Sequence, residues 1–439
     1  MKIPFARCVT PLLLTPLLAF AQQPSETPAA LNAEAVKAYQ AKDYAQFLSL
    51  EKRASQLAPD NPRYIYNTAC GEALQGNAHE AVRLLDQLVS WKVDLGAEKD
   101  DDFSKIRNSP AWSEFKSQVA ALRKPIVHST TAFTLPDPQL IATGVAVDQK
   151  TGDTFIASVR ARKILRRSKH GKVSDFIRQG QDGFLAGASL LIDPARRILF
   201  ASTAAVPFMA DYRPEDFGRS GVFAFNLKTG KLLQKALLPP DGKQHFLNAL
   251  ALDKEGNIYV SDSAGATVYR LRRNGKELEV FIPTDVFRST QGLAFSDDGK
   301  TLYVADFSDG IWAVDMATKN RRYLDRPSGV WLAGLDGLTR VPDGFIAVQL
   351  APAVRPERVL HLRLAPSGQK IASVDILEMN HPAYEGPIQG AVAGNAFFYV
   401  ANTQLDLGDA KTGAFAQDRA KPTVVLRLPV NFSAAHAER

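Results

Sequence analysis

The phrase NALALDKEGNIYVSDS, residues 248–263, decides the fold, because variants of it recur along the chain. Each copy has a polar or small residue, an apolar strand, a tight turn and a second strand. β-Branched and aromatic residues alternate with turn residues, which indicates strands rather than helices. The copies start 43 to 60 residues apart. Their first residues are Thr143, Ala188, Asn248, Gln291, Asp336 and Gln389.

Each copy leads into a third strand, such as KILRRS at 163–168, and turns such as KTGK at 228–231 lead into a fourth. Four strands per repeat of this length predict an all-β propeller with six blades. A single open sheet of that many strands would leave long exposed edges, which argues against it. The sixth copy ends after its third strand. The segment TTAFTL at 130–135 is therefore expected to supply the missing strand and close the ring.

The ring predicts where a ligand would bind. In four-stranded blades, the inner strands all start on one face, and the loops between second and third strands lie on that face too. Two of these loops are long, at residues 204–219 and 404–421. We therefore expect the six starting residues to surround a channel mouth that the two loops overhang. Such a cleft is the usual site for a small-molecule ligand.

These phrases resemble the gluconolactonase and regucalcin-like family over residues 130–430. Asn248 stands in a phrase similar to that family's metal-binding Asn phrase. Glu385-Gly386-Pro387 matches its EGP motif, although here in the last blade. In cyclic order Glu385 lies three blades from Asn248, as the family arrangement requires. The resemblance implies a metal-dependent lactonase whose calcium or zinc ion is bound by Glu385, Asn248 and Gln291.

Two positions depart from the family pattern. Gln291 replaces the family's Asp, and Ala188 replaces its second Asn. Divalent cations such as calcium prefer several oxygen ligands, usually with more than one carboxylate. Glu385 is then the sole matched carboxylate, although Asp336 could partly compensate. A weakened metal site, or none, stays open as an alternative.

If the implied chemistry is retained, the metal polarises a lactone carbonyl and lowers the pKa of a bound water. A base then removes the proton from that water, and Glu385, Asp336 and His245 are the candidates. His245 also fits a solvated surface position. The candidate substrate-binding residues are Thr143, Gln291 and Gln389. The alternative function is a non-catalytic propeller that binds a small molecule or a protein.

Residues 22–124 precede the propeller, which spans 125–439, and their apolar residues recur at helical spacing. Tyr44 and Phe47 correspond to Ala78 and Ala81, 34 residues further on, so the region resembles tetratricopeptide repeats. About two and a half units are too few to be stable alone, and we expect them to lean on the propeller. The module is either a packed scaffold or a dock for a protein partner. The acidic run 98–102 is expected to be a solvated turn.

The N-terminus, MKIPFARCVTPLLLTPLLAFAQQP, predicts a signal peptide over residues 1–21 and a periplasmic or secreted product. Cleavage would remove Cys8 and leave Cys70 as a lone thiol, which we expect to be buried and inert. No later segment is apolar enough to span a membrane. The net charge of +7 is carried by scattered basic residues, a pattern that gives no support to nucleic-acid binding.

Overall fold

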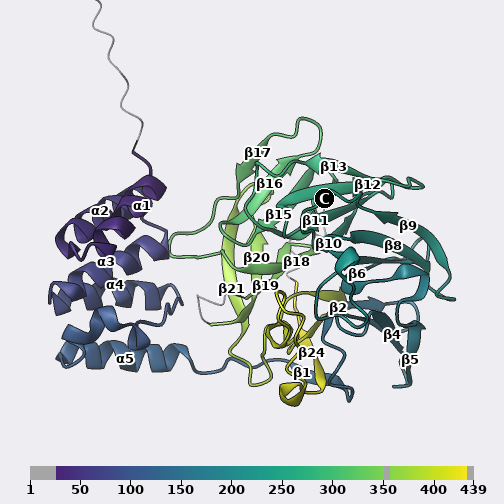
Figure 1. The fold of residues 1–439 in the computed structure, drawn as a ribbon, viewed down its shortest axis with the longest axis horizontal. Helices are drawn as coiled ribbons and strands as arrows, with labels where there is room; N and C mark the ends of the chain where they lie inside the picture. The colour runs from purple at the N-terminus through teal and green to yellow at the C-terminus, as the bar shows by residue number, and fades with distance from the viewer. Residues whose placement is uncertain (1–25, 351–355, 433–439) are drawn as a thin grey trace, which may run out of the picture.

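The computed structural model describes residues 26–350 and 356–432. The predicted signal peptide lies outside the described residues, so export stays a prediction. Figure 1 shows a stack of helices beside a larger body of strands. In the part of the chain that is described, no helix has both the length and the apolar character needed to cross a bilayer.

The helical module contains two helix pairs and a fifth helix. The helices are α1 (Pro28–Gln40), α2 (Tyr44–Leu57), α3 (Pro62–Leu74), α4 (Ala78–Ser90) and α5 (Pro110–Leu122). The first pair repeats after 34 residues, because α1 and α3 start at 28 and 62 and α2 and α4 at 44 and 78. Thr27, Asn61 and Ser109 cap three of these helices, each followed by a proline that suits a first helical position.

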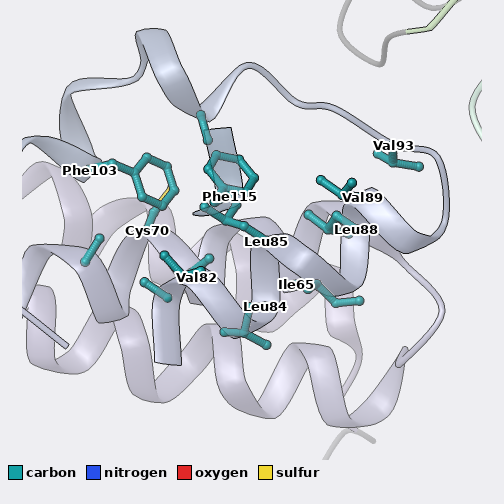
Figure 2. Close-up of a cluster of buried hydrophobic side chains, with 14 of the residues drawn as sticks. Ile65, Cys70, Val82, Leu84, Leu85, Leu88, Val89, Val93, Phe103 and Phe115 are labelled. Carbon is teal, nitrogen blue, oxygen red and sulfur yellow. The ribbon is translucent and has the colours of Figure 1, made fainter. Parts of the chain in front are cut away.

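The acidic run forms two short 3₁₀ helices, η1 (Ala97–Lys99) and η2 (Asp101–Ile106), and is more than a solvated turn. Asp100 accepts a 2.7 Å hydrogen bond from the Tyr66 hydroxyl, and Asp102 accepts one of 2.7 Å from Tyr39. The expectation holds in part, because Lys99 and Asp101 are exposed, whereas tyrosines on α1 and α3 supply donors that the run itself does not reveal. Cys70 is buried, as expected, and lies beside Phe103 in the helical core (Figure 2).

The propeller consists of six four-stranded sheets. Blade one is β2 (Ala142–Asp148), β3 (Asp153–Ser158), β4 (Lys163–Arg167) and β5 (Val173–Ile177). Blade two is β6 (Ala186–Asp193), β7 (Ile198–Ala204), β8 (Ser220–Asn226) and β9 (Leu232–Leu237). Blade three is β10 (Leu247–Leu252), β11 (Ile258–Asp262), β12 (Thr267–Leu271) and β13 (Leu278–Ile282).

The second half of the ring repeats this order. Blade four is β14 (Thr290–Phe295), β15 (Thr301–Asp306), β16 (Gly310–Asp315) and β17 (Arg321–Tyr323). Blade five is β18 (Leu335–Val341), β19 (Gly344–Gln349), β20 (Arg358–Leu364) and β21 (Ile371–Met379). Blade six is β22 (Gly390–Ala393), β23 (Ala396–Val400), β24 (Thr423–Pro429) and the early strand β1 (Thr130–Leu135). The predicted closure is thus confirmed, because β1 pairs antiparallel with β24.

A buried carboxylate fastens the chain just before the closing strand. Glu378, on β21, accepts hydrogen bonds from the Ser129 amide at 3.0 Å and the Ser129 hydroxyl at 2.7 Å. It also accepts one from the Tyr399 hydroxyl on β23. Since Glu378 is fully buried, these donors replace the water that an ionised carboxylate would otherwise need.

The helical module packs against blade five and the loop before it. The backbone of Ile126 pairs with Met379, which is buried together with the helical core. Gly329 lies against the ring of Trp91, so that a Cβ at this position would come within 2.9 Å of it. Asn380 donates a 3.1 Å hydrogen bond to the Leu122 carbonyl at the end of α5. The module therefore leans on the propeller, as expected of a short array. A protein partner for it stays a prediction.

The topology gives the disc two different faces. Adjacent inner strands contact each other around the ring and run in one direction. The turns that join first to second and third to fourth strands therefore share one face, which we call the strand-end face. The remaining loops share the opposite, strand-start face.

Candidate functional site

The strand starts contain β-bulges in five of the six blades. The register of each inner strand shifts at the position that the repeat phrase marks as its start. A bulge redirects side chains and interrupts pairing, and bulges are frequent beside functional sites. The bulges contain Thr143, Ala188, Asn248, Gln291 and Asp336.

Four polar side chains from these starts meet across the channel, and we call them the amide layer: Ser189, Asn248, Gln291 and Gln389. Asn248 donates a 2.7 Å hydrogen bond to Gln291 Oε1. Gln389, on the opposite side of the ring, donates to Asn248 Oδ1 at 3.4 Å and accepts from the Ser189 hydroxyl at 3.0 Å. The structure thus brings the predicted residues together, but their donors and acceptors satisfy one another.

Thr143 does not present a free hydroxyl to a ligand. It is buried, and its hydroxyl donates to the carbonyls of Gly187 and Ala188, both at 2.9 Å. The side chain therefore holds blades one and two together at this point. The sequence phrase identifies the position in the ring, but it does not show this contact between blades.

Glu385 is half-exposed and forms an ion pair with the Lys421 ammonium group. In the described chain, Cys70, Asp100 and Asp102 form the one trio of Cys, His, Asp or Glu close enough to share a metal ion. That trio lies in the helical module, and its carboxylates already accept from tyrosines. The mouth offers two carboxyl groups, Glu385, which is neutralised by lysine, and Asp336, and neither belongs to a group of three ligand residues among the described ones. Its amides bind each other. This donor set does not fit a resident divalent cation.

His245 is buried, so the expected solvated position is wrong. Its Nδ1 lies 2.5 Å from Asp262 Oδ2, and its Nε2 lies 3.1 Å from Asp241 Oδ1. Burial by itself lowers the pKa of His245, but the two carboxylates outweigh it and raise the pKa above its usual value. Both ring nitrogens are thus engaged. Asp262, at the end of β11, also accepts from the Phe246 and Gly265 amides, so its second oxygen holds the turn in place.

Asp336 differs from the other candidates, because its Oδ1 is buried without a hydrogen-bond partner. It starts the inner strand of blade five, between Gln291 and Gln389 in ring order. The residue as a whole is partly exposed, but its carboxyl group is desolvated. Desolvation raises the pKa of Asp336 to about 7. An unsatisfied carboxyl that exchanges its proton near neutral pH is a candidate functional group.

A cavity of about 930 Å³ occupies the channel on the other side of the amide layer. It extends from Ser189 and Gln389 to the exposed residues Lys150 and Pro194 in turns of the strand-end face. Each inner strand is paired on one side only, so its free backbone edge faces the channel. The sequence predicts a ligand cleft on the strand-start face, whereas this cavity opens on the strand-end face. The sequence does not show that the amide layer separates the two ends.

The two long loops on the strand-start face pack against each other. A Cβ on Gly408, in the blade-six loop, would lie 2.4 Å from the ring of Phe208 in the blade-two loop. The Arg160 guanidinium of blade one lies 4.5 Å from the ring centre of Phe415. The predicted overhang is therefore present, but it forms a packed apolar cover over blades one, two and six.

Comparisons with solved structures find proteins of similar fold. No family model matches the chain, and no curated protein matches it. A gluconolactonase structure from Xanthomonas campestris is 16% identical, with a TM-score of 0.46, over 71% of this chain and 93% of that one. A calcium-binding regucalcin from Agrobacterium tumefaciens is 16% identical, with a TM-score of 0.47, over 69% and 96%.

A virginiamycin B lyase from Staphylococcus aureus also matches, at 11% identity and a TM-score of 0.43, over 67% of this chain and 98% of the lyase. The structural neighbours thus include gluconolactonase-like and regucalcin-like propellers. Because these identities are low and the TM-scores lie below 0.5, we draw no functional conclusion from them. The six-bladed assignment rests on the strand pairing of the chain itself.

Proposed function

We propose that this propeller binds a small amphipathic anion in its central channel, entering from the strand-end face. The observation that supports this is the 930 Å³ cavity, whose size suits a small organic ligand. Its walls include apolar residues such as Leu252 and Phe295, together with the free strand edges. Lys150 stands at its opening without an ion-pair partner among the described residues. The apolar part of the ligand would thus enter the channel while its acidic group stays near Lys150.

The test uses the fluorescent dye 1-anilinonaphthalene-8-sulfonate, an aromatic sulfonate with this chemistry. Ala391 lines the cavity, so Ala391→Trp fills part of it and is expected to weaken saturable dye binding at least tenfold. Ala195→Trp is the matched control, because Ala195 is exposed on the same face outside the cavity. Absence of one-to-one dye binding in the wild type, or equal binding by both variants, would contradict the proposal. A cooperative urea transition in each variant excludes dye binding to a molten state.

A second candidate function, hydrolysis of a lactone or small ester, is favoured by Asp336. Its ionised carboxylate could accept the proton of a water that attacks the carbonyl, without a metal ion. The rate of acid release from a lactone panel should then rise with pH through about 7. It should persist in a chelator and be lost in Asp336→Asn. Equal rates in wild type and Asp336→Asn, or no turnover, would exclude this function.

A further inference from the structure

The turns and loops on the two faces of the propeller carry opposite net charge. The eleven turns of the strand-end face hold fourteen Lys and Arg against six Asp and Glu. The described loops of the strand-start face, apart from 350–357, hold eleven Lys and Arg against thirteen Asp and Glu. The positive charge that looks scattered along the sequence is therefore gathered on one side of the disc. A surface of one charge sign attracts partners of the other sign.

The excess is densest on blades one to three. Their outer turns, 168–172, 227–231 and 272–277, contain seven Lys and Arg and one Glu. Lys172, Lys231 and Arg273 are exposed, and none of them forms an ion pair with a described residue. A groove of about 610 Å³ between blades two and three is lined by five Lys and Arg and by no acidic residue.

Exposed apolar side chains stand on the outer strands of the same three blades. Val173 on β5 is 43% exposed, Leu233 on β9 is 51% exposed and Val280 on β13 is 60% exposed. Each blade thus presents a large apolar side chain within a few residues of a basic turn. Cations beside apolar side chains suit a lipid interface, where phosphates meet acyl chains. A soluble polyanion would be attracted by the cations and would gain nothing from the apolar residues.

We propose that the strand-end face of blades one to three binds an anionic lipid surface. The short turns bring Lys172, Lys231 and Arg273 to the headgroups, while Leu233 and Val280 enter the interface. This binding is independent of the channel ligand. It would, however, place the open end of the cavity against the lipid, so an amphipathic anion could enter the channel from there.

The test is co-sedimentation of the full chain with vesicles of phosphatidylcholine, with or without one quarter phosphatidylglycerol. The wild type should bind the anionic vesicles, and binding should fall as salt is raised. Each cation near the surface contributes roughly fivefold to the partition coefficient. The triple variant Lys172→Gln, Lys231→Gln and Arg273→Gln is therefore expected to bind roughly a hundredfold more weakly.

A matched triple variant distinguishes the effect of this particular face from the effect of the protein's net charge. Lys243→Gln, Lys411→Gln and Arg419→Gln remove the same charge from exposed positions on the strand-start face. This variant should bind anionic vesicles like the wild type. An equal loss in both triple variants, or equal wild-type binding to neutral and anionic vesicles, would overturn the proposal.

Chromatography on a heparin column distinguishes binding to a lipid surface from binding to a soluble polyanion. Leu233→Asn should weaken vesicle binding severalfold and leave the salt concentration of heparin elution unchanged. Loss of heparin binding in the strand-end triple variant, with vesicle binding intact, would assign the face to a soluble polyanion instead and overturn the lipid assignment. Retention of vesicle binding in Leu233→Asn would show that charge alone acts and would contradict the apolar part of the proposal.

Discussion

The two ends of the central channel use polar residues in opposite ways. At the strand-start end, Asn248 and Gln389 bind other members of the amide layer, His245 lies between two carboxylates, and Glu385 is paired with Lys421. At the strand-end end, free strand edges and Lys150, which has no ion-pair partner among the described residues, border a cavity. Polar groups that form hydrogen bonds with one another stabilise a fold, whereas polar groups without a partner in the protein can bind a ligand. The comparison predicts large stability effects at the first end and small ones at the second.

Glu378, near the strand-start end, should give the largest effect. Glu378→Ala leaves the buried Ser129 amide and hydroxyl without this acceptor and leaves the Tyr399 hydroxyl with the Tyr384 hydroxyl alone. We expect the free energy of unfolding to fall by about 3–5 kcal/mol. Urea denaturation measures this, with the exposed Glu277→Ala at the other end as a control that changes it by less than about 0.5 kcal/mol. If Glu378→Ala lowered the free energy of unfolding by less than about 1 kcal/mol, the proposed difference between the two ends would be contradicted.

Asp336 should give the next largest effect, and one that depends on pH. Its pKa is raised to about 7 from 3.8, so between these values the folded state holds a proton that the unfolded chain has released. Stability is therefore lost as pH rises from about 4 to about 7. Asp336→Asn cannot ionise, so its stability relative to wild type should be greater at pH 8 than at pH 5, by up to about 3 kcal/mol. Parallel pH profiles of the two proteins would show that Asp336 is ordinarily solvated.

The amide layer should respond more moderately. Asn248→Ala removes a donor to Gln291 and an acceptor from Gln389. Leaving these partners unsatisfied should cost about 1–3 kcal/mol of unfolding free energy. Chemical denaturation checks this, with the exposed Gln149→Ala at the cavity opening as the neutral comparison. If Asn248→Ala proved neutral, the layer would be open to water rather than closed.

The Glu385–Lys421 pair should give the smallest effect. The Glu385 and Lys421 side chains are 35% and 63% exposed, so Lys421→Ala should change the unfolding free energy by less than about 1 kcal/mol. Calcium and zinc should leave the Tm of the wild type unchanged, because the donor set does not fit them. A metal-dependent rise in Tm that Glu385→Ala abolishes would restore the metal site implied by the sequence.

Much of the fold could be predicted because it depends on local, repeated patterns. The six strand starts, the closing segment TTAFTL and the 34-residue helical spacing each need only a short stretch of sequence. The chemistry of the site depends on contacts that no such stretch contains. Gln389 reaches Asn248 across 141 residues of chain, and the bulge at the start of β10 decides where the Asn248 side chain points. His245 and Asp262 are 17 residues apart in the sequence. Their pairing still depends on how the loop between blades two and three folds back onto the end of β11.

The closure of blade six also means that the two strands that close the ring are synthesised far apart in time. β1 is made before any other strand, and its partner β24 is made after all of them, with Thr130 opposite Arg427. At the usual speed of translation, the interval between them is roughly 15 to 60 s. During that time the ring stays open and the free edge of β1 has no native partner. Correct closure of the ring therefore requires that β24 is synthesised before the free edge of β1 pairs with some other strand.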